Sequence, residues 1–425
     1  MKRRDFISKS ALSTLGTMFV PSFLKAFEQN SYQNNLNNHN QYDLANLGDK
    51  IIVILQLSGG NDGLNTVIPF RNDIYYKSRP KIAIQKDKIL PLTDEIGLNP
   101  ALLGLKKLYD EGLLGIFNGV GYPSPDRSHF RSMDIWHTAS ASNEYLQTGW
   151  LGRYLDAQCD TKCLPYQAIE IDDTLGLALK GEKLKALAMQ DIQKFYRLTR
   201  SKSLQKINDK NIIQTRTYQQ THQQAHQHEN VAYLYKTLAE TVSSADYINE
   251  KTTKAVKTAT NQADYPKNNF APKLKNIAQM INAGLETRVY YAELSGFDTH
   301  AGQLNRQAKL HTDYADSVYA FVQDLKKTGN LDKTVILTFS EFGRRVVENG
   351  SGGTDHGTAN NLFVIGGKLK KAGIYNPMPS LTDLNEGDLK HNIDFRSIYA
   401  TVLEKQLGQK HQHILGNDFE MLDFL

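Results

Sequence analysis

Six short apolar runs alternate with helical patterns, and this alternation constrains the fold of the chain most strongly. The runs cover residues 51–57, 114–120, 167–171, 289–294, 334–339 and 362–365. Helical periodicity occupies residues 100–111, 130–138, 151–157, 273–283, 306–327 and 395–407. Strands that alternate with helices favour a mostly parallel sheet covered on both faces. We therefore expect an α/β fold in which helices sandwich a mostly parallel sheet.

One polar segment, residues 190–268, interrupts this alternation. It is rich in Gln, Lys and Thr, and it predicts a helical insertion that leaves the sheet and returns. A chain of 425 residues can form one large α/β domain with such an insertion. We expect that domain to span residues 49–425.

The N-terminus has the pattern of a targeting segment. Arg3 and Arg4 precede Phe6 and a mildly apolar stretch at residues 11–23, which is typical of a twin-arginine signal. That stretch is too short and too polar for a stable transmembrane span; the alternative is a basic N-terminus on an amphipathic helix. We expect residues 1–27 to be a signal read by the twin-arginine export machinery, with the protein in the periplasm or cell envelope. Residues 28–48 are rich in Asn and Gln and predict a disordered linker.

Charge and cysteine content exclude some classes of partner. The 50 basic and 45 acidic residues give a net charge of +5, and the excess is spread along the chain, so no nucleic-acid partner is indicated. Cys159 and Cys163 are the only cysteines. In an exported chain they would form a local disulfide or remain two thiols.

Acidic residues and histidines gather in the loops that follow the apolar runs. Asp62 follows the first run, and Asp298 and His300 follow the run at 289–294. Asp355 and His356 stand in a Gly-rich loop beyond the run at 334–339, where glycines permit the bend that brings both side chains to one ion. Sites in open α/β sheets lie outside the carboxyl ends of strands. The pattern predicts a metal site; the alternative for Asp62 is an Asx turn.

A serine and its neighbours add candidates for catalysis. Ser128 stands where a helix begins, a position at which backbone N–H groups stabilise an anion, although most serines there are plain N-caps. Metal coordination would activate its weakly acidic hydroxyl. Arg127 could clamp an oxyanion, and His129 could be a ligand or a hydrogen-bond donor. Glu341 could be a ligand or a salt-bridge partner of the arginines that follow it.

These motifs together resemble a known group. The segments at residues 57–65, 127–130, 296–300, 340–344, 354–357 and 394–399, with the twin-arginine start, look like the bacterial family called domain of unknown function 1501. That family is similar in fold and motif order to the alkaline phosphatase and sulfatase superfamily. The resemblance implies one metal site made by Asp62, Ser128, Asp355 and His356.

The resemblance also implies a second site made by Asp298 and His300, and hence one or two divalent ions (zinc, manganese, magnesium or calcium). The chain departs from the superfamily in two ways. Its second motif is Asp-x-His in place of Asp-x-x-x-His, and His391 is the only near candidate for a further C-terminal histidine.

Two functions follow as hypotheses. The first is an exported, metal-dependent hydrolase of small phosphate or sulfate esters, with Ser128 as nucleophile and Arg127 as anion clamp. The second is a non-catalytic, metal-stabilised scaffold or binding protein of the cell envelope. Retention of Ser128 and Asp62 favours the enzyme, and the shortened Asp-x-His motif favours the scaffold.

Overall fold

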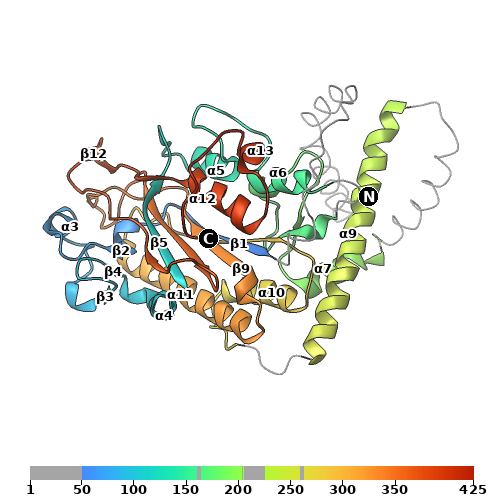
Figure 1. Cartoon of the computed structure of the whole chain (residues 1–425), viewed down its shortest axis with the longest axis horizontal. Helices are drawn as coiled ribbons and strands as arrows, with labels where there is room; N and C mark the ends of the chain where they lie inside the picture. Colours follow the sequence, from blue (N-terminus) through green and yellow to red (C-terminus); the bar gives the residue numbers. More distant parts are fainter. Residues whose placement is uncertain (1–49, 160–163, 203, 205–224, 259–262) are drawn as a thin grey trace, which may run out of the picture. The chain divides into compact units, whose positions relative to one another are not determined.

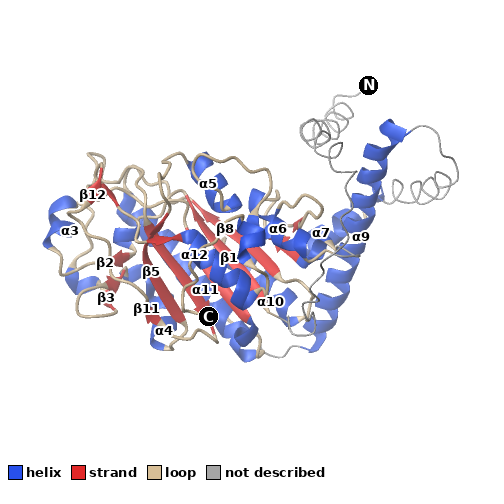
Figure 2. Ribbon diagram, turned by 45° about the horizontal axis from the view of Figure 1, so that its top comes forward, coloured by secondary structure: helices blue, strands red, loops and turns tan. Residues whose placement is uncertain are grey.

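A nine-stranded sheet forms the centre of the molecule (Figures 1 and 2). The computed structural model describes residues 50–159, 164–202, 204, 225–258 and 263–425. The strand order is β11-β5-β10-β9-β1-β8-β6-β7, and β14 also pairs with β5. The main strands are β1 (Ile51–Ser58), β5 (Leu114–Gly121), β6 (Ala168–Glu170), β8 (Val289–Ser295), β9 (Thr334–Phe339) and β10 (Asn360–Gly366). Short edge strands are β7 (Leu187–Ala188), β11 (Gly373–Ile374) and β14 (Ile393–Asp394).

The sheet is mostly parallel, as expected. β1 pairs in parallel with both β8 and β9, so that Ser58 lies opposite Ser295 and Gln56 opposite Phe339. β10 is the exception, since it runs antiparallel to β5 and β9. The residues that precede β10, and not those that follow it, therefore lie at the carboxyl edge of its neighbours.

Both faces of the sheet are covered, which explains why its strands are continuously apolar. In β1 the residues Ile51, Val53, Leu55 and Leu57 join one hydrophobic core, whereas Ile52 and Ile54 join the other. Alternate side chains of a strand point to opposite faces. Helices α4 (Leu103–Asp110), α10 (Ala271–Asn282) and α11 (Gln303–Lys327) supply the first core. Helices α5 (His129–Thr138), α6 (Trp150–Ala157), α12 (Phe395–Thr401) and α13 (His411–Leu415) supply the second.

The predicted strands and helices are confirmed, with boundaries that shift by a few residues. The helical pattern at 395–407 divides into α12 and a π-helical turn, Val402–Gln406. The polar segment at 190–268 contains α7 (Ile192–Thr199) and the long helix α9 (Ala225–Thr258). Smaller elements are α3 (Asp73–Ser78), β2 (Val67–Ile68), β3 (Leu90–Pro91), β4 (Gly97–Leu98), β12 (Leu384–Asn385) and β13 (Asp388–Leu389).

Some expectations lie outside the part of the chain that the structure describes. They are the signal at 1–27, the linker at 28–48, and Cys163 with the bond it could form. Among the described helices, none combines the length and the apolar character that crossing a membrane requires.

Candidate metal centre

Loops next to four strands meet at the carboxyl edge of the parallel strands. Asp298 and His300 follow β8, Glu341 follows β9, and His129 opens α5 beyond the end of β5. His356 comes shortly before β10, and the antiparallel direction of β10 brings it to the same edge. An isolated antiparallel bridge between Arg344 and His356 holds together the two halves of the single loop that joins β9 to β10.

Three imidazole rings surround the carboxylate of Asp298. Its Oδ1 atom lies 3.1 Å from Nε2 of His300 and 3.3 Å from Nε2 of His356, and those two nitrogens lie 3.1 Å apart. Its Oδ2 atom lies 3.7 Å from Nε2 of His129. One ligand atom each from His129, Asp298 and His356 lies within 4.8 Å of the other two. The rings of His129 and His356 meet edge to face with centroids 4.4 Å apart, and the rings of His300 and His356 are tilted with centroids 4.8 Å apart.

Each ring is oriented through its other nitrogen. Nδ1 of His129 lies 2.9 Å from Glu341, and Nδ1 of His300 lies 3.0 Å from Asp355. Nδ1 of His356 lies 2.8 Å from the main-chain oxygen of Arg127. All three partners are acceptors, so each Nδ1 carries a proton, and Nε2 is the nitrogen of each ring that can present a lone pair.

The result is a group of acceptors that face one another. Nε2 of His300, Nε2 of His356 and Oδ1 of Asp298 form a triangle with sides of 3.1, 3.1 and 3.3 Å. The centre of that triangle is about 1.8 Å from each corner, so a point just above its plane lies about 2.0–2.1 Å from all three, the length of zinc bonds to nitrogen and oxygen. Nε2 of His129 is buried and has no hydrogen-bond partner among the described residues. A proton would satisfy one pair of these atoms, whereas a divalent cation satisfies the whole group.

Arg344 holds the loops beneath this group. Its fully buried guanidinium donates to the carbonyls of Gly60 at 2.6 Å and Thr354 at 3.0 Å, and to those of Gly59 and Phe297. It also donates to Oδ1 of Asp298 at 2.9 Å. Burial alone would raise the pKa of Asp298, but this hydrogen bond and the charge of Arg344, with smaller effects of His356 and His300, lower it to about 2. Asp298 is therefore an anion at neutral pH.

The neighbouring groups shift in directions that fit these contacts. The hydrogen bond with Glu341 raises the pKa of His129 in spite of burial. Burial lowers the pKa of His356, although its bond to the Arg127 carbonyl opposes this. Hydrogen bonds from Asn349 and His300 lower the pKa of Asp355.

Two glycines allow the loops to approach closely. A Cβ atom on Gly353 would lie 2.4 Å from the backbone of His300 and Thr299, and one on Gly59 would lie 2.4 Å from the backbone nitrogen of Asp298. Gly59 also has φ = +116°, which L-residues rarely adopt. The glycines predicted to bend the loop of Asp355 and His356 thus have a specific task, because Gly353 lets this loop contact the loop of His300.

Glu341 and Asp355 stand one contact away from the converging atoms. Glu341 is buried, and it accepts from the backbone nitrogen of Gly59 at 2.8 Å as well as from His129. Asp355 is exposed and accepts from Asn349 at 3.1 Å. Both carboxylates thus occupy the positions that orient ligating histidines in known metal sites.

Asp62 lies in a separate buried network. Its Oδ2 atom accepts from Arg79 at 2.5 Å and from Gln303 at 2.5 Å, and its Oδ1 atom accepts from the backbone nitrogen of Leu64 at 3.2 Å. Gln303 in turn accepts from Thr354 at 2.6 Å. Asp62 makes an Asx turn, which was the alternative to its role as a metal ligand. Through Gln303 it also supports the loops of the centre.

The side chain of Arg127 has other partners than the expected anion, whereas Ser128 stands where a helix begins, as expected. The guanidinium of Arg127 forms ion pairs with the buried carboxylate of Asp388 and, at 3.3 Å, with Glu386. Its contact with the centre is made by its main-chain oxygen. Ser128 is the exposed N-cap residue of α5, its backbone nitrogen donates to Asp126 at 2.7 Å, and its hydroxyl makes no hydrogen bond to the described residues.

Sequence reasoning missed the roles of Arg344 and Gln303. Arg344 stands inside the 340–344 motif, so its position was visible although its five contacts were not. Gln303 carries no sequence signal, because it precedes the helical pattern that begins at residue 306. His391, the candidate for a further histidine, lines a cavity together with Glu341.

Several solved structures are similar to this chain at low identity. They include the sulfatase PsFucS1 from Pseudoalteromonas sp. (12% identity, 88% of this chain and 70% of that one, TM-score 0.39). Another is a protein in the alkaline phosphatase superfamily from Vibrio parahaemolyticus (11%, 87% and 69%, TM-score 0.39). A third is the C-terminal periplasmic domain of EcEptC from Escherichia coli in complex with Zn (9%, 75% and 72%, TM-score 0.34). Likeness at this level carries no conclusion about activity.

No curated protein matches this chain. Residues 118–420 match the model of the family described as "Protein of unknown function (DUF1501)". The matched region holds more than half of the chain and includes His129, Asp298, His300 and His356. The chain belongs to the DUF1501 family of proteins of unknown function.

Proposed function

We propose that this protein is a metal-dependent hydrolase of phosphate or sulfate esters, with one divalent ion held by His129, Asp298, His300 and His356. The observation that carries the proposal is the orientation of the three rings. Each ring is fixed through Nδ1, so that its Nε2 lone pair faces the anionic Asp298. Three histidines and one carboxylate match the ligand preference of zinc.

Access to solvent supports catalysis over a closed structural site. The side chains of Asp298 and His300 are each 46% exposed, and those of His129 and His356 are about a quarter exposed. A catalytic zinc site keeps a position open for water or substrate, so with four protein ligands the ion would have to accept a fifth ligand, an expansion that zinc sites allow. A bound divalent ion would supply positive charge that polarises an ester oxygen and lowers the pKa of a hydroxyl beside it.

Ser128 is the proposed nucleophile. It directly precedes His129 at the N-terminus of the ten-residue helix α5, where the helix dipole favours negative charge. Its oxygen would attack phosphorus or sulfur and displace the ester alcohol. The serine proton would pass to solvent, the alcohol would take up a proton, and water would then release the acid from Ser128. The ion pairs of Arg127 exclude it from clamping the anion unless they break.

A panel of aryl phosphate and sulfate esters, assayed with added zinc, manganese, magnesium or calcium, tests this function. Ser128→Ala should abolish turnover and leave the melting temperature within a few degrees of wild type, since an exposed N-cap contributes only about 1 kcal/mol. Ser201→Ala, on the turn after α7, is the matched control and should keep full activity. Unchanged turnover in Ser128→Ala would remove this serine from the mechanism.

A second function, a metal-stabilised scaffold, is favoured by one observation. The four proposed ligands come from three separate loops, so a bound ion would cross-link the edge of the sheet whether or not it catalyses a reaction. The same panel separates the two functions. Silence on every ester, with metal demonstrably bound, would replace the hydrolase by the scaffold.

We also propose export by the twin-arginine route to the periplasm or cell envelope. The pair Arg3 and Arg4 with the short apolar stretch behind it supports this proposal. The double variant Arg3→Lys with Arg4→Lys should keep the protein inside the cell, as fractionation of the host would detect. Normal export of that variant would contradict the proposal.

A further inference from the structure

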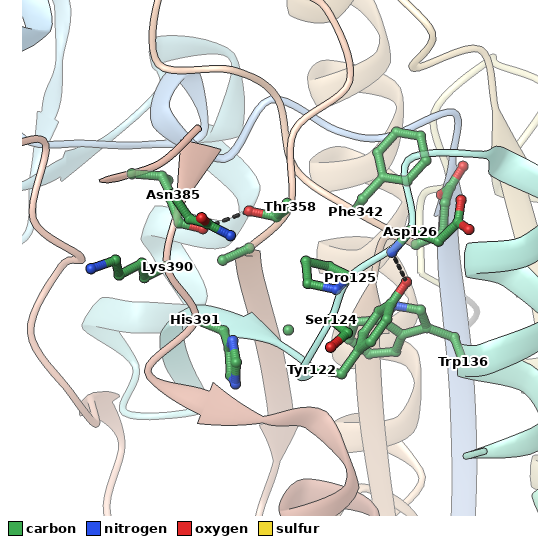
Figure 3. A pocket seen from close by; sticks show the side chains of 14 residues that line it. Tyr122, Ser124, Pro125, Asp126, Trp136, Phe342, Thr358, Asn385, Lys390 and His391 are labelled. Atoms are coloured by element: carbon green, nitrogen blue, oxygen red, sulfur yellow. Dashed lines mark hydrogen bonds between the residues drawn. The ribbon is translucent and has the colours of Figure 1, made fainter. Parts of the chain in front are cut away.

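A cavity of about 280 Å³ opens beside the metal centre (Figure 3). Glu341 and Phe342 belong to its wall, and they also contact the centre. Glu341 accepts from His129, and the ring of Phe342 lies 4.8 Å from the rings of both His129 and His356. The loop after β5 forms another part of the wall and continues into His129. A molecule in the cavity would therefore lie next to the proposed ligands.

The cavity has an aromatic side and a polar side. Tyr122, Trp136 and Phe342 stand on one side in Figure 3 together with Ser124 and Asp126, and Asn385, Lys390 and His391 stand on the other. Trp136 is fixed by stacking on Phe339 and Phe395, with ring centroids 4.7 and 4.2 Å apart. The aromatic side is thus rigid and apolar, and no more than 3% of the surface of each of its three aromatic residues is exposed.

Several polar groups of the cavity have hydrogen-bonding capacity to spare. The indole nitrogen of Trp136 is buried and has no acceptor among the described residues. The side chains of Asn385 and His391 make no hydrogen bond within the described part of the chain. Lys390 pairs with Asp383 alone, although an ammonium group has three protons to donate. Burial lowers the pKa of His391, so its neutral ring can both donate and accept at neutral pH.

We propose that this cavity binds one uncharged sugar ring. Such a ring has an apolar face that would lie against the aromatic side and hydroxyl groups that would meet the polar side. A plain aryl ring would make no hydrogen bond to the polar side or to the buried indole nitrogen of Trp136, which has no acceptor among the described residues. The volume lies near the lower end of the roughly 300–1,000 Å³ typical of small-molecule sites, which suits one ring better than a chain of sugars.

As a statement about substrate, this inference rests on the proposed function, because the sugar would be the alcohol part of the ester. As a statement about binding it does not, since no lining side chain is one of the four proposed ligands. Sugar binding should therefore persist in metal-free protein and in Ser128→Ala. Sugar binding without any turnover would support the assignment of the cavity and refute the hydrolase. Turnover without sugar binding would support the hydrolase and refute the assignment of the cavity.

Tryptophan fluorescence of the full chain is the measurement, with glucose, galactose, mannose and N-acetylglucosamine as probes and phenol as comparison. The chain has two tryptophans, Trp136 and the buried Trp150. We expect a saturable change in Trp150→Phe and none in Trp136→Phe. A change that persists in Trp136→Phe, saturation by phenol alone, or no saturation by any sugar would overturn the proposal.

Exposed residues provide a second test that does not depend on the fold of the tryptophan variants. Lys390→Ala and Asn385→Ala should each raise the dissociation constant about fivefold, the loss expected of one hydrogen bond. Lys370→Ala is the matched control, because Lys370 is an exposed lysine with one carboxylate partner, Asp423. It should bind as wild type does. Equal affinities in all three variants, measured by ligand-observed NMR, would also overturn the proposal.

Discussion

At the scale of single residues, the two nitrogens of each histidine have different tasks. Asp355 accepts from Nδ1 of His300, and this contact fixes both the tautomer and the ring plane. Outer carboxylates of this kind typically contribute about 10–100-fold to metal affinity. The same carboxyl group would contribute far more as a direct ligand, so its substitution measures which role it has.

Asp355→Asn should therefore weaken zinc binding by about 10–100-fold and leave the stoichiometry at one ion. Isothermal titration calorimetry of metal-free protein measures both quantities. Asp423→Asn, at an exposed carboxylate that pairs with Lys370, is the control and should not change affinity. Complete loss of binding in Asp355→Asn would show that Asp355 is itself a ligand.

Glu170 gives a residue-scale prediction that does not involve the metal. Burial raises the pKa of this carboxyl to about 7, with further increases from Asp172 and Glu293, while its bond from the Gly176 nitrogen opposes the shift. A folded-state pKa above the unfolded value means that the folded chain binds more protons between the two values. The contribution of Glu170 to the free energy of unfolding is thus fully present below the pKa of the unfolded state and is lost as pH rises through about 7.

Glu170→Gln, which is uncharged, should raise the free energy of unfolding at pH 8 by on the order of 3 kcal/mol and change it little at pH 4. Urea unfolding at both pH values measures this. Glu182→Gln, at an exposed position, serves as the control and should show no such difference. A variant less stable than wild type at pH 8 would contradict the charged state inferred for Glu170.

At the scale of elements, the centre depends on how closely two loops approach. Gly353 faces the backbone of Thr299 and His300, so any side chain there must push the loops apart. Gly353→Ala should reduce zinc affinity at least about tenfold, because a displaced ring loses its ligand geometry. Gly350→Ala, in the same loop with no atom within 4 Å of its added Cβ, should bind zinc normally. Equal zinc affinities in Gly353→Ala and Gly350→Ala would mean that the approach of the two loops does not determine zinc binding.

The elements are also where sequence reasoning was most successful. Continuous apolar runs such as residues 51–57 mark strands covered on both faces, and polar residues directly behind them mark the functional edge. The direction of each strand could not be predicted from the sequence pattern. It is the antiparallel direction of β10 that brings His356 to that edge.

The roles of individual carboxylates could not be predicted for a related reason. Asp62 has no sequence feature that separates it from a ligand, and its partner Arg79 lies 17 residues away. Glu341 and Asp355 stand beside histidines in space, but only the direction of each ring distinguishes a ligand from a residue that orients one. Such directions depend on tertiary packing, which a local pattern does not contain.

At the scale of the whole molecule, a metal that binds only the folded chain must stabilise it. With free zinc at about 100 times the dissociation constant, binding adds about 2.7 kcal/mol to the free energy of unfolding. Chelation should therefore lower the melting temperature by several degrees, and added zinc should restore it. A melting temperature that does not respond to chelator, in protein shown to contain metal beforehand, would show that the bound ion does not stabilise the folded chain.

The metal content of the purified, folded protein tests the central claim most directly. Elemental analysis should find one divalent ion per chain after equilibration with zinc. His300→Ala and His356→Ala should each lose it, while His413→Ala, at an exposed histidine of α13, should retain it. Absence of a stoichiometric ion after exposure to zinc, manganese, magnesium or calcium, or equal metal content in all three variants, would contradict the metal centre described here.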